Sequence, residues 1–346
     1  EVPDAVPYPW WPVDQKSSGP VEVPVRRYAA LLGDERRLIH PALGRNRCVE
    51  DVYEPEASFK PFVWALVTDA GLASMDERFD THGGFWRTPY GRSIEDVTRR
   101  DDMSWHEVLV NSSNIGIIKA ASRMSYAGLR DGVVKLGFGR KTRIGLPGEA
   151  SGLITAPKDW KDYTQTSVAF GHEIAVTPMQ MVRAFSALCR SGEDAGTIPD
   201  LTLAGADRDG PGVSRRVFRS ETVSRVRAAL REVAEKAELW MERELGEAGW
   251  RYTMFGKSGT ADLPVGPAPD GYRRPPGASG YLEEQYVSSF IAGAPLDTPR
   301  IALVVVIDDP GPAQIDSRLH YGSKAAGPVA RRIVERTLAY LRVTPD

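Results

Sequence analysis

Apolar positions follow a helical period along most of this chain. A spacing of three to four residues predicts helices over residues 59–70, which follow Pro55, and over residues 220–245. The same spacing predicts further helices over residues 29–39, 105–124, 179–190 and 327–341. The 105–124 stretch is interrupted by the polar cluster Asn111-Ser112-Ser113-Asn114, whereas Thr177-Pro178 provides a favourable start for the helix at 179.

The period changes after residue 250. Residues 252–255, 286–294 and 301–308 are predicted strands, and the unbroken apolar run at 301–307 is typical of a central strand. Two segments rich in Gly, Pro and Asp, 191–213 and 262–284, are predicted loops. Helices around a few late, neighbouring strands favour an α+β fold with an antiparallel sheet.

The first 27 residues contain six prolines and the pair Trp10-Trp11, so this segment cannot form a helix. We interpret it as an extended arm that packs against another part of the protein. A length of 346 residues is compatible with two domains or one large domain. The arm and the short predicted helix after it cover residues 1–39, which leaves residues 40–346 for the rest of the protein.

The composition is that of a soluble globular protein, with 42% hydrophobic and 26% charged residues. The formal net charge of -2 argues against a nucleic-acid surface spread over the domain. The longest apolar run has seven residues, whereas a membrane helix needs about 20. Cys48, Cys189 and the five histidines show no metal-ligand spacing, so we expect neither metal nor cofactor. Cys189 lies in an apolar run and is predicted to be buried.

Three short polar motifs occur in a characteristic order. The first is Glu54-Pro55-Glu56-Ala57-Ser58-Phe59-Lys60-Pro61, the second is Ser112-Ser113-Asn114, and the third is Lys257-Ser258-Gly259-Thr260. Each motif alone is weak, because such triplets usually form turns or caps. Together they resemble the S-x-x-K, S-x-N and K-[ST]-G set of the penicillin-recognising serine acyl transferases.

The flanking segments narrow this resemblance to the class B penicillin-binding proteins. They are Arg45-Asn46-Arg47-Cys48-Val49, Tyr53-Glu54-Pro55, residues 137–152, residues 170–180, residues 286–310, Tyr321-Gly322 and Ala325-Ala326-Gly327-Pro328-Val329. The resemblance covers residues 40–342 and implies the penicillin-binding transpeptidase fold, which is serine β-lactamase-like. That fold has an antiparallel sheet of about five strands flanked by helices, plus an all-helical lobe, so the resemblance implies one bilobed transpeptidase domain over residues 40–346. It normally has an early strand, which we do not find in residues 1–40.

The resemblance implies a peptidoglycan D,D-transpeptidase, which moves a peptide acyl group from a terminal D-Ala to an enzyme hydroxyl and then to an amine. It assigns Lys60 as the base, Ser112 as a proton relay, and Asn114 as the side chain that holds a substrate amide. The backbone N–H groups of residues 57 and 260 would form the oxyanion hole.

The third motif is the substrate-binding strand in the same resemblance. Lys257 would supply positive potential, and Ser258 and Thr260 would hydrogen-bond the substrate carboxylate, with Gly259 between them. The implied partners are peptidoglycan stem peptides, β-lactams and proteins of the divisome or elongasome, with no nucleic acid. The implied location is extracytoplasmic. An N-terminal membrane anchor and a pedestal domain are also implied, so we expect this sequence to be a piece of a longer, anchored protein.

The first motif departs from the family pattern. An alignment to E-P-G-S-x-F-K-P without a gap places Ala57 at the nucleophile position and Glu56 at a Gly. A methyl group cannot attack a carbonyl, so the chain is expected to form no acyl-enzyme and to bind β-lactams non-covalently at most. Ser58 lies two positions from Lys60, and such side chains point about 200° apart on a helix, so Ser58 should face away from the base.

Two interpretations of Ala57 stay open at this point. One is an inactivated transpeptidase, as an engineered change would produce, and the other is a natural pseudoenzyme that binds or scaffolds in the division or elongation machinery. A β-lactam sensor or a class D β-lactamase relative is disfavoured by the length of chain before Ser112 and by the run from Gly171 to Gln180.

Overall fold

The structure, a computed structural model, describes residues 6–13, 21–25, 45–203, 214–266, 268 and 270–346. Its helices are α1 (Arg47–Glu50), α2 (Lys60–Asp69), α3 (Trp105–Val110), α4 (Asn114–Ala121), α5 (Tyr126–Lys135), α6 (Asp162–Ala169), α7 (Pro178–Cys189), α8 (Ser220–Leu245), α9 (Pro312–Asp316), α10 (Gly322–Ala325) and α11 (Gly327–Tyr340). Short 3₁₀ turns are η2 (Glu56–Phe59), η3 (His82–Gly84), η4 (Pro157–Asp159) and η5 (Gly192–Asp194). The strands are β1 (Val6–Pro12), β2 (Val21–Val25), β3 (Arg78–Asp80), β4 (Phe85–Arg87), β5 (Ser93–Glu95), β6 (Asp102–Ser104), β7 (Leu153–Ile154), β8 (Ile174–Ala175), β9 (Thr197–Pro199), β10 (Ser214–Arg216), β11 (Phe255–Pro264), β12 (Tyr272–Arg273), β13 (Tyr281–Ala294) and β14 (Ile301–Asp308).

The main sheet is antiparallel, in the order β11-β13-β14. Strand side chains alternate between its two faces, because successive residues point to opposite sides. Phe290 and Ala292 lie on the face covered by α11 and the C-terminal half of α8, whereas Ile291 lies on the face toward α7. Two hydrophobic clusters therefore sandwich one sheet, which confirms the predicted α+β class.

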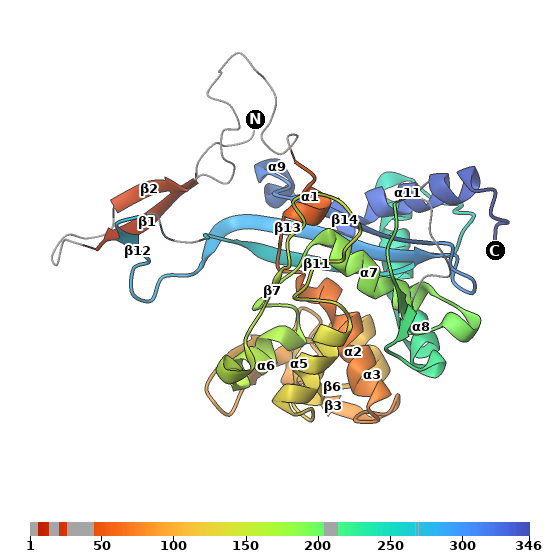
Figure 1. Ribbon diagram of the computed structural model, residues 1–346, viewed down its shortest axis with the longest axis horizontal. Coiled ribbons are helices and arrows are strands. Elements are labelled where there is room, and N and C mark those ends of the chain that lie inside the picture. The colour runs from red at the N-terminus through yellow and green to blue at the C-terminus, as the bar shows by residue number, and fades with distance from the viewer. Residues whose placement is uncertain (1–5, 14–20, 26–44, 204–213, 267, 269) are drawn as a thin grey trace, which may run out of the picture.

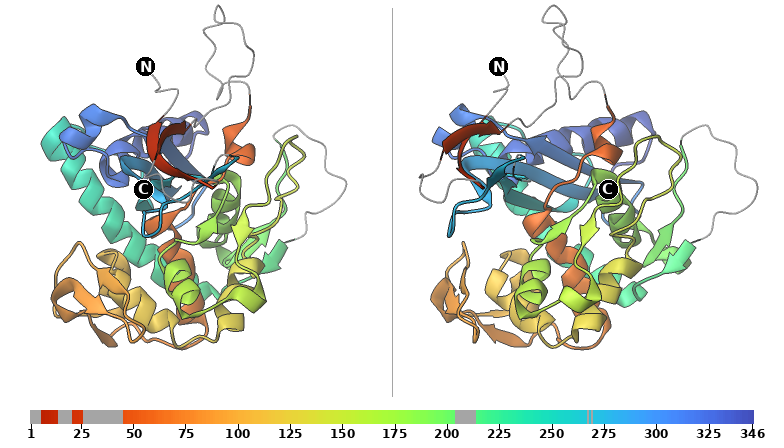
Figure 2. Two further views of the ribbon diagram at one scale, coloured as in Figure 1. Left: turned by 90° about the vertical axis from the view of Figure 1, so that its left-hand side faces the viewer. Right: turned by 60° about the vertical axis from the view of Figure 1, so that its left-hand side comes forward.

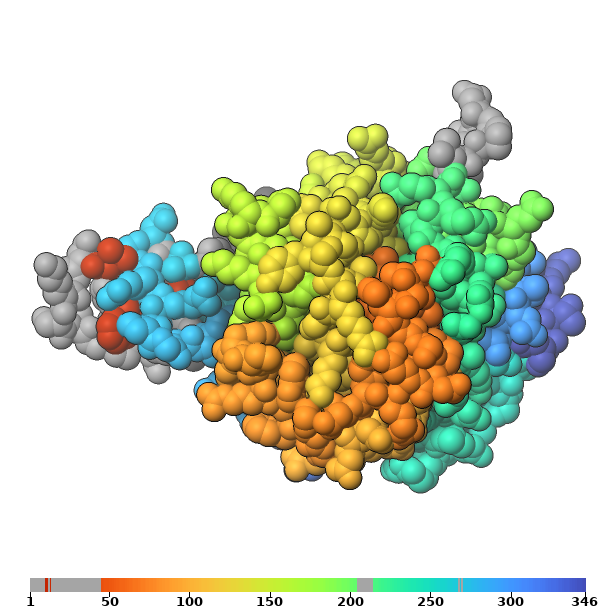
Figure 3. All heavy atoms as spheres, turned by 90° about the horizontal axis from the view of Figure 1, so that it is seen from below, coloured from red at the N-terminus to blue at the C-terminus, as the bar shows by residue number. Residues whose placement is uncertain are grey.

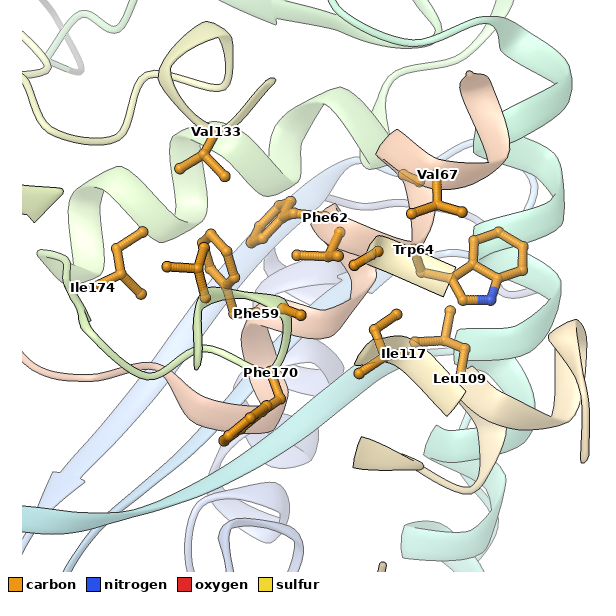
Figure 4. Packing of buried hydrophobic residues seen from close by; sticks show 14 of the residues in the cluster. Phe59, Phe62, Trp64, Val67, Leu109, Ile117, Val133, Phe170 and Ile174 are labelled. Atoms are coloured by element: carbon orange, nitrogen blue, oxygen red, sulfur yellow. The ribbon is translucent and has the colours of Figure 1, made fainter. Parts of the chain in front are cut away.

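A helical lobe forms the lower half of the molecule, below the sheet (Figures 1 and 2). At the centre of this lobe, helix α2 packs against α3, α4, α5 and α8. Phe59, Phe62 and Phe138 meet edge to face with ring centroids 5.0–5.5 Å apart, and Trp64 stacks on Trp105 at 5.3 Å. Phe62, Trp64 and Val67 of α2 point into the lobe on different sides of the helix (Figure 4), so the helix that begins at Lys60 is fixed rigidly.

Helix α8 joins the two halves, because it contacts α2 and α3 in the lobe and β11 in the sheet. It spans the residues predicted for it, and Gly246 ends it in the left-handed conformation at φ 67°. Helix α7 begins with a capping box between Thr177 and Gln180, close to the predicted start. The polar cluster at 111–114 separates α3 from α4, as predicted.

Two predictions for this region need correction. Residues 252–254 lie outside β11, which begins at Phe255. The predicted loop at 262–284 contains the end of β11, β12 and the start of β13, because these long strands continue beyond the apolar residues that mark them. Strand β14 pairs with β13, and no other described strand pairs with it, so the central position expected for it stays a prediction.

The described sheet has three strands, fewer than the five or so that the resemblance implied. The Pro-rich arm is extended where it is described, but β1 and β2 pair with each other and with β12, forming a separate small sheet. This sheet projects beyond one end of the main sheet in Figure 1 and stands beside the lobe in Figure 3. The predicted helix at 29–39 lies outside the described residues.

Candidate active site

The first two motifs meet at the Lys60 ammonium group, which is almost fully buried. Lys60 Nζ donates to the backbone oxygen of Ser112 at 2.6 Å and to Asn114 Oδ1 at 2.6 Å. The Ser112 hydroxyl lies 3.1 Å from the same nitrogen. The lysine that begins α2 is thereby joined to the turn between α3 and α4.

Local backbone geometry places Ser112 in this position. Ser112 adopts φ 57°, which reverses the chain between two helices that would otherwise run on. Ser113 then caps α4 by accepting from Gly116 N at 2.8 Å. The predicted interruption is therefore the feature that presents Ser112 and Asn114 to Lys60.

Asp96, a buried residue just after β5, holds this turn from behind. Its carboxylate accepts from Asn114 N at 2.5 Å, from Ile115 N at 3.1 Å and from the Ser113 hydroxyl. A carboxylate at a helix N-terminus interacts favourably with the exposed N–H groups and the helix dipole. Sequence analysis missed Asp96, because nothing in the sequence around it indicates that it reaches α4.

The third motif lies on β11, directly beside η2. A Cβ on Gly259 would come within 2.6 Å of the Pro55 oxygen and 2.9 Å of Ser289 Oγ, so only glycine allows this close approach. Gly259 therefore has a packing role that its grouping with the substrate-binding residues did not anticipate.

Lys257 is buried on β11, and its Nζ donates to the backbone oxygen of Ser258 at 2.9 Å. Burial and the positive charge of Lys60 lower the pKa of Lys257 to about 7, against an opposing effect of Glu56. Thr260 lies three residues along the strand, and its hydroxyl oxygen accepts from Gly322 N at 2.9 Å. Lys257 and Lys60 are thus close enough to influence each other electrostatically.

Ala57 and Ser58 lie in η2, one turn before α2. Ala57 is 7% exposed, whereas Ser58 is fully buried. The Ser58 hydroxyl donates to the Pro55 oxygen at 2.6 Å and lies 3.4 Å from Ser289 Oγ. The Ser58 hydroxyl thus contacts the sheet, whereas the Lys60 ammonium group hydrogen-bonds Ser112 and Asn114. This agrees with the prediction that Ser58 faces away from Lys60.

Glu56 places its carboxylate where sequence analysis did not foresee. Glu56 Oε2 accepts from the backbone N–H of Ala57 and from that of Thr260, the latter at 3.2 Å. These are the two N–H groups that the resemblance assigns to the oxyanion hole. Glu56 itself adopts φ 48°, and its own N–H donates to the Gly171 oxygen at 3.0 Å.

The carboxylates of Glu56 and Asp96 affect the pKa of Lys60 in the same direction. Burial lowers the pKa of Lys60, while the charges of Glu56 and Asp96 oppose that effect. Both carboxylates therefore favour the protonated, cationic form of this lysine.

His172 has a structural position beside Glu54. Its Nδ1 lies 3.4 Å from Glu54 Oε2, which also accepts from the Tyr281 hydroxyl at 2.7 Å. The other carboxylate oxygen, Glu54 Oε1, accepts from Glu173 N at 3.0 Å. Burial opposes ionisation of Glu54, but the hydrogen bonds from His172 and Tyr281 outweigh it and lower its pKa. This cluster ties the 170–173 loop to the start of β13.

Within the described ranges, no group of three or more His, Cys, Asp or Glu side chains is arranged to hold a metal ion. None of the helices described is both long and apolar enough to cross a membrane. Both described cysteines are free, and Cys189 is buried as predicted.

A sheet beside a helical lobe, with a lysine-containing helix start, a Ser-x-Asn turn and a Lys-Ser-Gly strand converging between them, defines the class of penicillin-recognising acyl transferases. The family model "Penicillin binding protein transpeptidase domain" matches residues 33–335, and this chain belongs to that family.

Individual relatives agree with this assignment. The chain is 29% identical over 315 residues to the probable peptidoglycan D,D-transpeptidase PbpC of Pseudomonas aeruginosa, covering 90% of this chain and 50% of that protein. It is 30% identical to the peptidoglycan D,D-transpeptidase FtsI of Escherichia coli, covering 87% of this chain and 46% of FtsI. The chain thus spans about half the length of the curated relatives it matches.

A solved structure with the same fold is the apo transpeptidase domain of penicillin-binding protein 3 from Burkholderia pseudomallei. It is 28% identical, has a TM-score of 0.74, and the match covers 88% of this chain and 84% of that one. The penicillin-binding transpeptidase fold that the sequence motifs implied is therefore confirmed.

Proposed function

We propose that this transpeptidase domain forms no acyl-enzyme and acts by binding, as a non-catalytic component of peptidoglycan synthesis. The observation that carries the proposal is Ala57, the residue that precedes Lys60 by three positions at the start of α2. Acyl transfer through a covalent intermediate needs a hydroxyl there, and alanine supplies none. The hydroxyl next to it in sequence, that of Ser58, is buried against Pro55 and Ser289.

The remaining site residues support ligand binding. In this proposal Lys257 supplies positive potential to a ligand carboxylate, and the hydroxyls of Ser258 and Thr260 donate hydrogen bonds to it. Asn114 holds a peptide amide, and the Lys60–Ser112 pair keeps its hydrogen-bonded geometry. A carboxylate-ended stem peptide is the ligand that this arrangement suits.

The setting of the domain is part of the same proposal. Several relatives are named peptidoglycan D,D-transpeptidases. We infer from them an extracytoplasmic location on a membrane-anchored parent protein, with divisome or elongasome proteins as partners. Residues 40–346 would be the transpeptidase-type domain and residues 1–39 its N-terminal arm. β-Lactams would bind non-covalently at most.

An intact-mass measurement after incubation with benzylpenicillin tests the loss of chemistry. The unaltered chain should gain no mass, and FtsI of Escherichia coli serves as the acylated positive control. A stoichiometric adduct on the unaltered chain would overturn the proposal, and peptide mapping would show which residue had reacted.

Binding is tested separately by saturation-transfer NMR with a stem peptide that ends in D-Ala-D-Ala. The unaltered chain should give a signal that Thr260→Val reduces, because that variant lacks the hydroxyl. An absent signal, or an equal signal from both proteins, would contradict the proposed ligand.

A further inference from the structure

We propose that the Glu56 carboxylate is a resident anion in the oxyanion hole of this domain and keeps the carbonyl oxygen of an acyl donor out of the hole, independently of Ala57. This inference rests on the proposed function and deepens it, because it assigns a second residue to the loss of acyl transfer. It also specifies which binding pose the site rejects: one in which a β-lactam or peptide places its reacting carbonyl oxygen in the hole. A stem peptide held by its carboxylate and its amide alone is still accepted.

Two backbone N–H groups form the oxyanion hole assigned here. An oxyanion hole consists of N–H donors aimed at one point, where negative charge develops in the transition state. Here the donors are Ala57 N, from η2, and Thr260 N, from β11, and a single atom, Glu56 Oε2, accepts from both. A carboxylate oxygen thus already occupies the point at which a reacting carbonyl oxygen would have to sit.

The backbone of Glu56 is fixed in this position. Its φ of 48° is a conformation that glycine adopts readily and that costs a residue with a side chain about 1–2 kcal/mol. Its N–H donates to the Gly171 oxygen, and a Cβ on Gly171 would come within 2.2 Å of the Glu56 oxygen. The surrounding chain therefore allows Glu56 little choice of backbone conformation and directs its side chain toward the hole.

Electrostatics gives this carboxylate a second effect. Lys60 and Lys257 are both nearly fully buried, and Glu56 favours the charged form of each. A lysine can accept a proton from a nucleophile only in its neutral form. Glu56 thereby opposes the neutral form of Lys60, which burial favours, as well as filling the hole.

A restored nucleophile therefore should not restore full reactivity. In acylation, the hydroxyl oxygen introduced at position 57 forms a bond to the β-lactam carbonyl carbon, the ring C–N bond breaks, and the hydroxyl proton passes by way of Lys60 to the ring nitrogen. Loss of one oxyanion-hole donor slows such reactions about 10²–10³-fold. A carboxylate that occupies both donors should slow acylation at least as much.

The kinetic test compares three proteins by intact mass and by labelling with a fluorescent penicillin. They are the Ala57→Ser variant, the Glu56→Gly/Ala57→Ser double variant, and the Asp262→Asn/Ala57→Ser double variant as a charge-matched control. Asp262 lies on β11 two residues after Thr260, so its neutralisation removes a nearby charge without opening the hole. Acylation of the Glu56→Gly double variant should be at least about 100-fold faster than that of the other two. Equal rates for Ala57→Ser and the Glu56→Gly double variant would overturn the proposal.

A second measurement needs no acylation at all. In amide NMR of the otherwise unaltered chain, Glu56→Gly should move the proton resonances of Ala57 and Thr260 upfield together, because both lose the same acceptor. Asp262→Asn should leave them in place. If neither resonance moves in Glu56→Gly, the carboxylate does not occupy the hole. Both tests compare variants, so their outcome does not depend on whether the unaltered chain forms an adduct. An adduct on the unaltered chain would refute the proposed function instead.

Discussion

Replacement of Asp96 by alanine should destabilise the protein strongly, although we assign this residue no contact with a ligand. Asp96 is 4% exposed and accepts three hydrogen bonds, from the Ser113 hydroxyl, Asn114 N and Ile115 N. Its removal leaves three donors at the start of α4 without this acceptor and removes a negative charge from the helix N-terminus.

The magnitude follows from these contacts. Hydrogen bonds to a charged group contribute about 1.5–3 kcal/mol each, and a favourable partly buried charge at a helix terminus up to about 2 kcal/mol. These contributions overlap, and water can solvate part of the opened turn, so the expected loss is about 3–5 kcal/mol rather than their sum. Asp96→Asn keeps an oxygen that can accept from Asn114 N and Ile115 N but loses the charge. It should cost about 1–2 kcal/mol.

Urea unfolding followed by tryptophan fluorescence measures both losses, because Trp64 and Trp105 lie in the core of the same lobe. Asp76→Ala, at an exposed position between α2 and β3, is the control and should change stability by less than about 0.5 kcal/mol. If Asp96→Ala is no more destabilising than Asp76→Ala, the three hydrogen bonds do not hold α4, and our account of how Asn114 reaches Lys60 fails.

Two further predictions concern protonation and thiol access. The pKa of Lys257, lowered to about 7 by burial, is below the ordinary 10.5 of the unfolded chain. The unfolded state therefore binds more protons between these values, so the Lys257 contribution makes stability rise with pH from about 7 toward 10.5. Lys257→Met should flatten that rise in urea unfolding at pH 7 to 9, and an unchanged slope would contradict it. A disulfide-exchange reagent should label the exposed Cys48 in the native protein. Cys189 is buried, and burial raises the pKa of its thiol to about 12, so it should react only after unfolding. Rapid labelling of both cysteines in the native protein would show that the β13 side of α7 opens.

Much of the fold could be predicted because its long helices carry their own signals. Helix α8 repeats its apolar stripe over seven turns and spans the predicted residues, and α7 has a capping box at its start. Strand pairing had no such local signal. The run at 301–307 is apolar on both faces, and among the described strands it pairs with β13 alone, a pairing that depends on tertiary context rather than on a local pattern.

The site was predictable to the extent that motifs alone identify side chains. The order of the three motifs indicated that Lys60, Ser112, Asn114 and Lys257 belong together, and the structure brings the first three within hydrogen-bond distance. Asp96 could not be found this way, because its contact with α4 is formed only by the folding of β5 against that helix.

Glu56 departs from the family motif, and the consequence of that departure is visible only in its three-dimensional contacts. With Ala57 alone, the hole would keep two unoccupied N–H donors, and glycine at position 56 would avoid the cost of a left-handed conformation. That cost is about 1–2 kcal/mol, whereas hydrogen bonds to a carboxylate contribute about 1.5–3 kcal/mol each. Two such bonds, to Ala57 N and Thr260 N, outweigh the strain, and the carboxylate also lies near two buried lysines. The two substitutions are therefore physically coupled: once no hydroxyl at position 57 needs the hole, a neighbouring anion can fill it with a net gain in stability. This coupling favours a protein that has adapted to binding over a transpeptidase with one residue changed.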